Sequence, residues 1–232
     1  IGSLSAIARK AQKLWERALP LIITALTAAA VSAVLTRAMI PWLKARGAVA
    51  TENDRTLHTG AIPKGGGLPL LISAVIVTSA FDPLPSLAPP LMAGLVALTV
   101  LSWRDDVAPL HPLVRFLVHA GAAALFVLSL PPEAAVFQGW LPVALDRALT
   151  ILALTWMMNL YNFMDGINGI AGAETVAIAG GYLALGATGA AALSYLPLAA
   201  AILGASAGFL VWNAREKALV FLGDAGSVPL GF

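Results

Sequence analysis

The sequence contains no cysteine and few charged residues. Without cysteine there is no disulfide framework, no thiolate nucleophile and no cysteine-ligated metal site. Only 11% of the 232 residues are charged, against about 25% in an average soluble domain. Hydrophobic residues make up 59% of the chain and the mean hydropathy is +0.85. The shortage of charge indicates that lipid surrounds most of the protein, and a net charge of +2 is too small to indicate nucleic acid as a partner.

Long apolar runs recur along the chain, and most approach the roughly 20 residues that cross a bilayer as a helix. Proline and glycine mark their ends, and no strand alternation or internal repeat is visible. The sequence therefore predicts an all-α, polytopic transmembrane helix bundle. It has about seven complete spans, with the start of an eighth after Ser227. The runs lie near 20–41, 66–81, 88–103, 112–130, 147–162, 173–190 and 196–213.

The first residues differ from the rest. Residues 1–19 are basic and carry apolar side chains at helical spacing, which is typical of an interfacial helix lying on a membrane. A signal anchor is the alternative. We therefore expect two parts, an interfacial segment at 1–19 and a transmembrane domain at 20–232. The domain is expected to be incomplete, because the chain stops inside an apolar run.

Four polar loops share one face of the membrane if each run crosses once. Lys and Arg gather in these loops, whereas the opposite loops have only Arg147, at a helix edge. The positive-inside rule then makes the polar face cytoplasmic. The basic residues at 9, 10, 13 and 17 argue for the other orientation. The four loops are 42–65, 104–111, 163–172 and 214–226.

The first polar loop has three consecutive glycines after a Pro-Lys pair, in NDRTLHTGAIPKGGG (53–67). Glycine permits tight backbone conformations with exposed N–H groups, which suit a phosphate. Lys64 and Arg55 could supply positive charge for an anion. A flexible turn with basic residues at the membrane surface is the alternative.

The second polar loop follows two adjacent carboxylates, Asp105 and Asp106. Such a pair repels itself near hydrocarbon, unless a cation shares it or one group is a base with a raised pKa. On a helix the two side chains project about 100° apart, so they could do two different jobs. Arg115 and His119 are four residues apart and should lie on one helix face. A solvated helix end and a packed histidine are the alternatives.

The third polar loop is NLYNFMDGINGIAG (159–172). Asn159, Asn162 and Asp165 follow one another at steps of three, which places them along one side of a helix as it reaches the surface. The glycines that follow permit turning and close helix approach. A glycine-rich connector is the alternative, although a connector would not need the aligned polar residues.

The fourth polar loop is VFLGDAGSVPLGF (220–232). Glycines on both sides of Asp224 let a tight turn present its carboxylate. Ser227 is a candidate N-cap for the next helix, and Phe221 offers an aromatic face to a base. A capping turn without further function is the alternative.

Taken together, these loops indicate one kind of chemistry. Hard oxygen ligands, glycine-rich anion loops and basic residues on one face are typical of Mg²⁺-assisted phosphoryl or glycosyl-phosphoryl transfer. A secondary transporter with a carboxylate relay is the alternative. It is less favoured, because the acids cluster at helix ends on one face and no repeated half is visible.

The ordered motifs RTLHTGAIPKGGG, DDVAPLHPLVRFLVH, NLYNFMDGINGIAG and FLGDAGSVPLGF resemble the polyprenyl-phosphate N-acetylhexosamine-1-phosphate transferases over about residues 50 to 232. This family includes the phospho-MurNAc-pentapeptide translocase. The resemblance implies a bundle of transmembrane helices with a cytoplasmic site, in a bacterial inner membrane. It also implies transfer of a sugar phosphate from a UDP-N-acetylhexosamine to undecaprenyl phosphate, with release of UMP. The third motif looks most like the branch that primes O-antigen or capsule glycans.

The resemblance also implies roles for individual residues. Asp105 resembles the base that deprotonates the lipid phosphate, with Asp106 in support, and Asp165 an acidic catalytic residue. Asp224, with Asp165, resembles the ligand set for Mg²⁺ or Mn²⁺. Substrate contacts are implied for eight further residues and Phe221: Arg55, His58, Lys64, Gly66, Gly67, Arg115, Asn162 and Asn168. A homodimer in the bilayer is a further expectation.

Two departures from the family pattern qualify this resemblance. Some members have Asp where this chain has Asn168, which makes Asn168 a better partner for uracil than for a metal. The family also has a His-rich loop beyond the point at which this chain ends. The histidines of this chain, His58, His111 and His119, do not belong to that motif.

Overall fold

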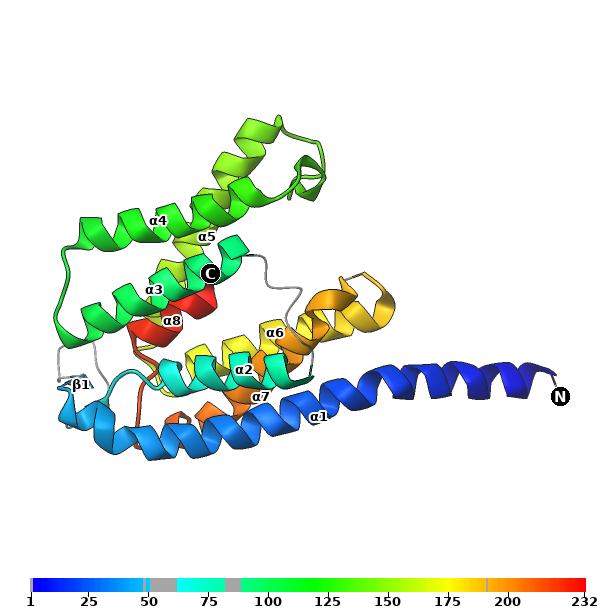
Figure 1. Cartoon of the computed structure of the whole chain (residues 1–232), viewed down its shortest axis with the longest axis horizontal. Helices are drawn as coiled ribbons and strands as arrows, with labels where there is room; N and C mark the ends of the chain where they lie inside the picture. The colour runs from blue at the N-terminus through cyan, green and yellow to red at the C-terminus, as the bar shows by residue number, and fades with distance from the viewer. Residues whose placement is uncertain (1, 48, 51–61, 82–88, 191) are drawn as a thin grey trace.

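The computed structural model describes residues 2–47, 49–50, 62–81, 89–190 and 192–232, and this part of the chain is predominantly helical (Figure 1). Val49–Ala50 (β1) and Ile62–Pro63 (β2) form a short antiparallel pair, and short 3₁₀ turns lie at Pro132–Ala134 and Leu193–Tyr195. The helices are α1 (Gly2–Ala45), α2 (Gly67–Phe81), α3 (Pro89–Val107), α4 (Pro112–Ser129), α5 (Val143–Met164), α6 (Ile170–Thr188), α7 (Leu196–Asn213) and α8 (Asp224–Gly231).

The predicted class, a polytopic helical membrane protein, is confirmed. Every predicted apolar run coincides with a helix, and five helical segments in the described part are long and apolar enough to cross a membrane. The other two predicted spans are less regular. Helix α2 has only 15 residues, and α3 ends in three charged residues, Arg104, Asp105 and Asp106.

The first helix is longer than a bilayer is thick. It continues for 44 residues from Gly2 to Ala45, through Pro20 and Pro41, without a break at the predicted boundary between 19 and 20. At 1.5 Å per residue it measures about 66 Å, roughly twice the hydrocarbon core. Part of the helix must therefore lie outside the hydrocarbon, and the interfacial location of residues 1–19 stays a prediction.

The bundle has two hydrophobic cores. One joins α1, α2 and α7 through side chains such as Leu43, Leu70 and Phe209, and the other joins α3, α4, α5 and α8 through Leu98 and Met158. The short helix α8 packs against α2, α3 and α5, so it links the two cores. Figure 1 shows it between these groups of helices.

Helices α1 and α7 pack with their backbones in close contact. A Cβ atom added at Gly204 would meet the backbone of Ala25, and one at Gly208 would meet that of Ala29. Two side chains add hydrogen bonds to opposing carbonyl groups: Ser32 Oγ to Ala205 O at 2.7 Å, and Trp212 Nε1 to Ala33 O at 2.7 Å. Small residues four apart commonly make such close contacts between membrane helices.

Candidate active site

The first and fourth polar loops are joined through their backbones. Phe221 N donates to Pro63 O at 2.9 Å, Gly66 N to Phe221 O at 2.8 Å, and Gly67 N to Leu222 O at 2.8 Å. The sequence predicted exposed N–H groups at these glycines, and this is wrong for Gly66 and Gly67, because both amides bind carbonyl groups of the fourth loop. Both residues are buried, and no room remains for a side chain on either of them.

Asp106 binds the beginning of α8. Its Oδ1 accepts from Asp224 N at 3.1 Å and its Oδ2 from Ala225 N at 3.0 Å. The first amides of a helix have no partner within the helix, and a carboxylate suits their positive end. The prediction of Ser227 as N-cap is wrong: α8 begins at Asp224, and Ser227 Oγ donates to Gly223 O at 3.0 Å inside the helix.

Asp165 binds the turn immediately before α8. It follows the last residue of α5 and accepts from Leu222 N at 3.2 Å and Gly223 N at 2.7 Å. The pKa of Asp165 is raised to about 8, chiefly by burial; these two hydrogen bonds lower it, and the charges of Asp106 and Asp224 raise it. The carboxylates of Asp106 and Asp165 thus hold four consecutive amides, those of residues 222–225.

Gly223 makes this turn possible. Its φ of +73° lies in the left-handed region that L side chains rarely adopt. A Cβ atom there would also come within 2.7 Å of Asp106 Oδ2. The predicted use of glycine next to Asp224 is therefore confirmed at this position.

Asp105 points away from Asp106 and faces Arg115. Its Oδ2 is 2.8 Å from Arg115 Nη1, and its Oδ1 accepts from Leu110 N at 2.6 Å. The same guanidinium nitrogen lies 3.7 Å from Asp224 Oδ2. The expectation that the adjacent carboxylates do two jobs is confirmed in their geometry, since Asp105 faces Arg115 and Asp106 caps a helix.

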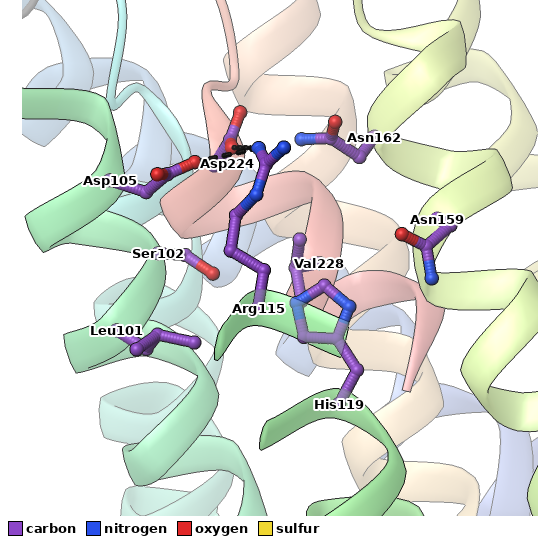
Figure 2. Close-up of a pocket in the computed structure, with 9 residues that line it drawn as sticks. All are labelled: Leu101, Ser102, Asp105, Arg115, His119, Asn159, Asn162, Asp224 and Val228. Atoms are coloured by element: carbon purple, nitrogen blue, oxygen red, sulfur yellow. Dashed lines mark hydrogen bonds and ion pairs between the residues drawn. The ribbon is translucent and has the colours of Figure 1, made fainter. Parts of the chain in front are cut away.

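A pocket of about 60 Å³ opens beside this ion pair. Figure 2 shows that α3, α4, α5 and α8 all contribute to it, and that Arg115 extends between Asp105 and Asp224. His119 lies one helical turn beyond Arg115, so the predicted shared face of α4 is confirmed. The lining residues are Leu101, Ser102, Asp105, Arg115, His119, Asn159, Asn162, Asp224 and Val228.

The pKa of Asp224 is affected by burial and by four neighbouring polar side chains. The pKa of Asp224 is raised to about 7, first by burial and then by the charge of Asp106 and a hydrogen bond with Asp105, against the lowering effects of Asn162 and Lys64. Asn162 also donates to Ser227 Oγ at 3.2 Å. Lys64 and Asn162 thus lie near Asp224, while their predicted contacts with a substrate stay predictions.

The two predicted uracil contacts lie in the third and fourth loops. Phe221 is only 4% exposed. Asn168 Nδ2 donates to Arg215 O at 2.8 Å, while its buried Oδ1 has no partner in the described part of the chain. Their contacts with a nucleotide stay predictions. Arg55 and His58 lie outside the described residues.

Sequence reasoning missed Asn213, at the end of α7. This buried residue accepts from Gly169 N at 2.8 Å through Oδ1 and donates to Val220 O at 2.9 Å through Nδ2. It therefore ties the third loop to the fourth. The available signal was a single amide at the end of an apolar run.

The pocket contains the type of ligand atom that a hard divalent cation prefers. Asp105, Asp224 and Asn162 supply oxygen atoms, the ligands that Mg²⁺ prefers. In the described residues, no three His, Asp or Glu side chains already form a metal cluster, and Arg115 is the cation that Asp105 and Asp224 share. Asp165, the second predicted metal ligand, binds backbone amides with both oxygen atoms instead and does not line the pocket.

Comparison with known proteins finds relatives that are named as transferases. A "probable undecaprenyl-phosphate N-acetylglucosaminyl 1-phosphate transferase" of Bacillus subtilis (strain 168) is 28% identical over 198 residues, covering 80% of this chain and 53% of its own. A phospho-N-acetylmuramoyl-pentapeptide-transferase of Synechococcus sp. (strain JA-3-3Ab) is 30% identical, covering 92% and 66%. A decaprenyl-phosphate N-acetylglucosaminephosphotransferase of Mycobacterium tuberculosis (strain ATCC 25618 / H37Rv) is 28% identical, covering 99% and 62%.

The chain thus spans between about half and two thirds of the length of these relatives. The model of the family described as "Glycosyl transferase family 4" matches residues 89–232, more than half of the chain, including all four carboxylates at the site. On this match, the chain belongs to glycosyl transferase family 4.

Proposed function

We propose that the protein containing this chain transfers an N-acetylhexosamine-1-phosphate from a UDP-sugar to undecaprenyl phosphate and releases UMP. The observation that carries the proposal is the gathering of Asp105, Asp106, Asp165 and Asp224 at one end of a membrane bundle. Two of these carboxylates shape the backbone, and the other two face the pocket beside a single guanidinium. Relatives named as prenyl-phosphate sugar-phosphate transferases support the same reaction class.

In this reaction Asp105 takes the proton of the lipid phosphate, whose oxygen then attacks the β-phosphorus of the UDP-sugar. Asp105 is the proposed base because it lines the pocket beside Arg115, whose guanidinium would bind the phosphate next to it. Asp106 and Asp165 fix the turn that presents Asp224. Arg115 and Lys64 supply positive charge for the phosphates.

A Mg²⁺ ion, or Mn²⁺, would be held by Asp224, with Asp105 and Asn162 nearby. Such an ion would compete with Arg115 for the two carboxylates, and Arg115 would then be available to a substrate phosphate. When bound, the metal supplies positive charge that neutralises the diphosphate. Asp165 would not bind the metal; it holds the turn before Asp224 by accepting hydrogen bonds from the backbone amides of Leu222 and Gly223.

The finer assignments follow from the sequence. The excess of Lys and Arg in the polar loops supports a cytoplasmic site in a bacterial inner membrane. The residue sequence of the third motif supports a role in the first step of O-antigen-type glycan synthesis. Asn168 and Phe221, at the junction of the third and fourth loops, are the proposed contacts for uracil, and a homodimer in the bilayer completes the proposal.

The test is UMP release by the purified full-length protein with undecaprenyl phosphate, Mg²⁺ and a panel of UDP-N-acetylhexosamines. Asp224→Asn should lower kcat at least a hundredfold, because an amide has no charge for the metal. Glu133→Gln, an exposed acid at the other end of the bundle, is the control and should leave the rate unchanged. No UMP with any sugar would refute the reaction, and full activity of Asp224→Asn would refute the metal assignment.

A further inference from the structure

One polar side chain in the pocket is not used by the reaction described above. His119 lies on α4 and is only 4% exposed, yet its Nδ1 has no hydrogen-bond partner in the described part of the chain. Buried polar groups are nearly always paired, so an unpaired one needs an explanation. Because His119 lines the pocket, a ligand there could supply the missing partner.

The pocket has two chemically different ends. In Figure 2, Asp105, Asp224 and Asn162 surround the tip of Arg115 at one end, while His119 and Asn159 lie toward the other. The carboxylates suit a cation. The imidazole of His119 offers an N–H donor, which suits a phosphate oxygen atom, whereas the amide nitrogen of Asn159 already donates to Thr155 O at 2.7 Å. An anion between Arg115 and His119 would contact one cationic and one neutral donor from the same face of α4.

His119 also lies deeper in the bundle than Arg115. Helix α4 begins at Pro112, near the polar loops, and His119 is four residues beyond Arg115, a rise of about 6 Å. The outer surfaces of α4 and α5 are apolar, with Leu117 59% and Trp156 71% exposed, as expected for helices that face lipid chains. The His119 end of the pocket is therefore closer to the apolar middle of the bundle than the Arg115 end is.

We propose that His119 is a positioning residue that donates a hydrogen bond to the phosphate of the lipid acceptor. This inference rests on the proposed function, because it assumes a prenyl phosphate as one substrate. The hydrogen bond holds the phosphate between Arg115 and His119, with its oxygen atoms toward Asp105. The other source of the same chemistry is the diphosphate of the UDP-sugar, which approaches from the aqueous end.

The experiment measures binding and kinetics separately, with the full-length protein in detergent. The binding probes are undecaprenyl phosphate, undecaprenol and a UDP-N-acetylhexosamine, each followed by thermal stabilisation of the protein. The variants are His119→Leu, which removes the donor, and His119→Gln, which restores an N–H. Thr175→Val is the control, since Thr175 is also 4% exposed but lies on α6 and does not line the pocket.

We expect His119→Leu to weaken binding of undecaprenyl phosphate about tenfold, the effect of one hydrogen bond to a charged group. Binding of undecaprenol, which has no phosphate, and of the UDP-sugar should not change. In turnover, KM for the lipid should rise while KM for the UDP-sugar stays the same. His119→Gln should recover most of the loss, and Thr175→Val should behave as the wild type.

Three results would overturn the inference. Equal binding of undecaprenyl phosphate by His119→Leu and wild type would show that His119 does not bind the lipid phosphate. A selective loss of UDP-sugar binding would assign His119 to the nucleotide instead, and wild-type protein that does not bind the lipid phosphate would refute the contact altogether. Absence of UMP release from wild-type protein that binds the lipid would refute the proposed reaction, while the binding comparison would still decide the role of His119.

Discussion

At the scale of single residues, the same side-chain type does two different things at this site. Asp106 and Asp165 each accept two backbone amides, while Asp105 and Asp224 face a shared guanidinium. The sequence identified all four carboxylates, because acids are rare in apolar chains. It could not separate their roles, since partners such as Asp106 and Asp224 lie 118 positions apart.

We expect Asp165→Asn to destabilise the protein even without substrate. The amide of Asn would place a donor against the N–H of Leu222 or Gly223, so one buried amide would lose its acceptor. The cost should be about 1–3 kcal/mol, visible as a lower midpoint of thermal unfolding in detergent above pH 8, where Asp165 is ionised. Glu174→Gln, an exposed acid on α6, is the control. An unchanged midpoint for Asp165→Asn would contradict the role in holding the turn.

At the scale of elements, the sequence predicted the helices well, but it did not predict the contacts between the loops. The run 112–130 became α4 (Pro112–Ser129), because apolar length and terminal proline are local signals. The start of α8 was misplaced, because Ser227 fits the local pattern of an N-cap while Asp106, from another helix, binds the first amides. Asn213 escaped attention for the same reason, since its partners Gly169 and Val220 belong to different loops.

At the opposite end of the bundle, Asp146 also holds a connecting segment by accepting hydrogen bonds from two backbone amides. This residue in the first turn of α5 is 2% exposed, and it accepts from Val136 N at 3.1 Å and Phe137 N at 2.8 Å. Asp146→Ala should release the connection between α4 and α5 at a cost of about 1–3 kcal/mol. Amide hydrogen exchange should become faster at these two residues.

This change should leave the candidate active site intact, because Asp146 lies at the far end of α5 from Asp165. The rate of UMP release per folded molecule is therefore expected to stay that of the wild type. Slow exchange at Val136 and Phe137 in Asp146→Ala would show that other contacts hold the connection.

At the scale of the whole molecule, close backbone contacts unite the bundle. Gly204 on α7 leaves no space for a side chain against Ala25 of α1, and Gly67 of α2 lies similarly against Gly226 of α8. Apolar runs alone do not reveal these pairs, because almost every helix here contains glycine. Which glycine faces a neighbour depends on how the helices pack.

We expect Gly204→Leu to separate α1 from α7 and to destabilise the protein by about 3 kcal/mol through overpacking. Gly181→Leu is the matched control, because a Cβ atom at Gly181 meets nothing within 4 Å. Thermal unfolding in detergent distinguishes the two variants. Equal unfolding midpoints for the two variants would show that α1 and α7 can move apart without a loss of stability.

The two bidentate carboxylates also set the order in which the site can form during synthesis. Asp106 and Asp165 emerge from the ribosome long before residues 222–225, whose amides they bind. A nascent chain that ends before Leu222 therefore has its helices α1 to α7 but leaves both acids without these partners. Residues 222–225 therefore complete this end of the site, so its assembly waits for the start of α8 while the earlier membrane helices can insert one after another.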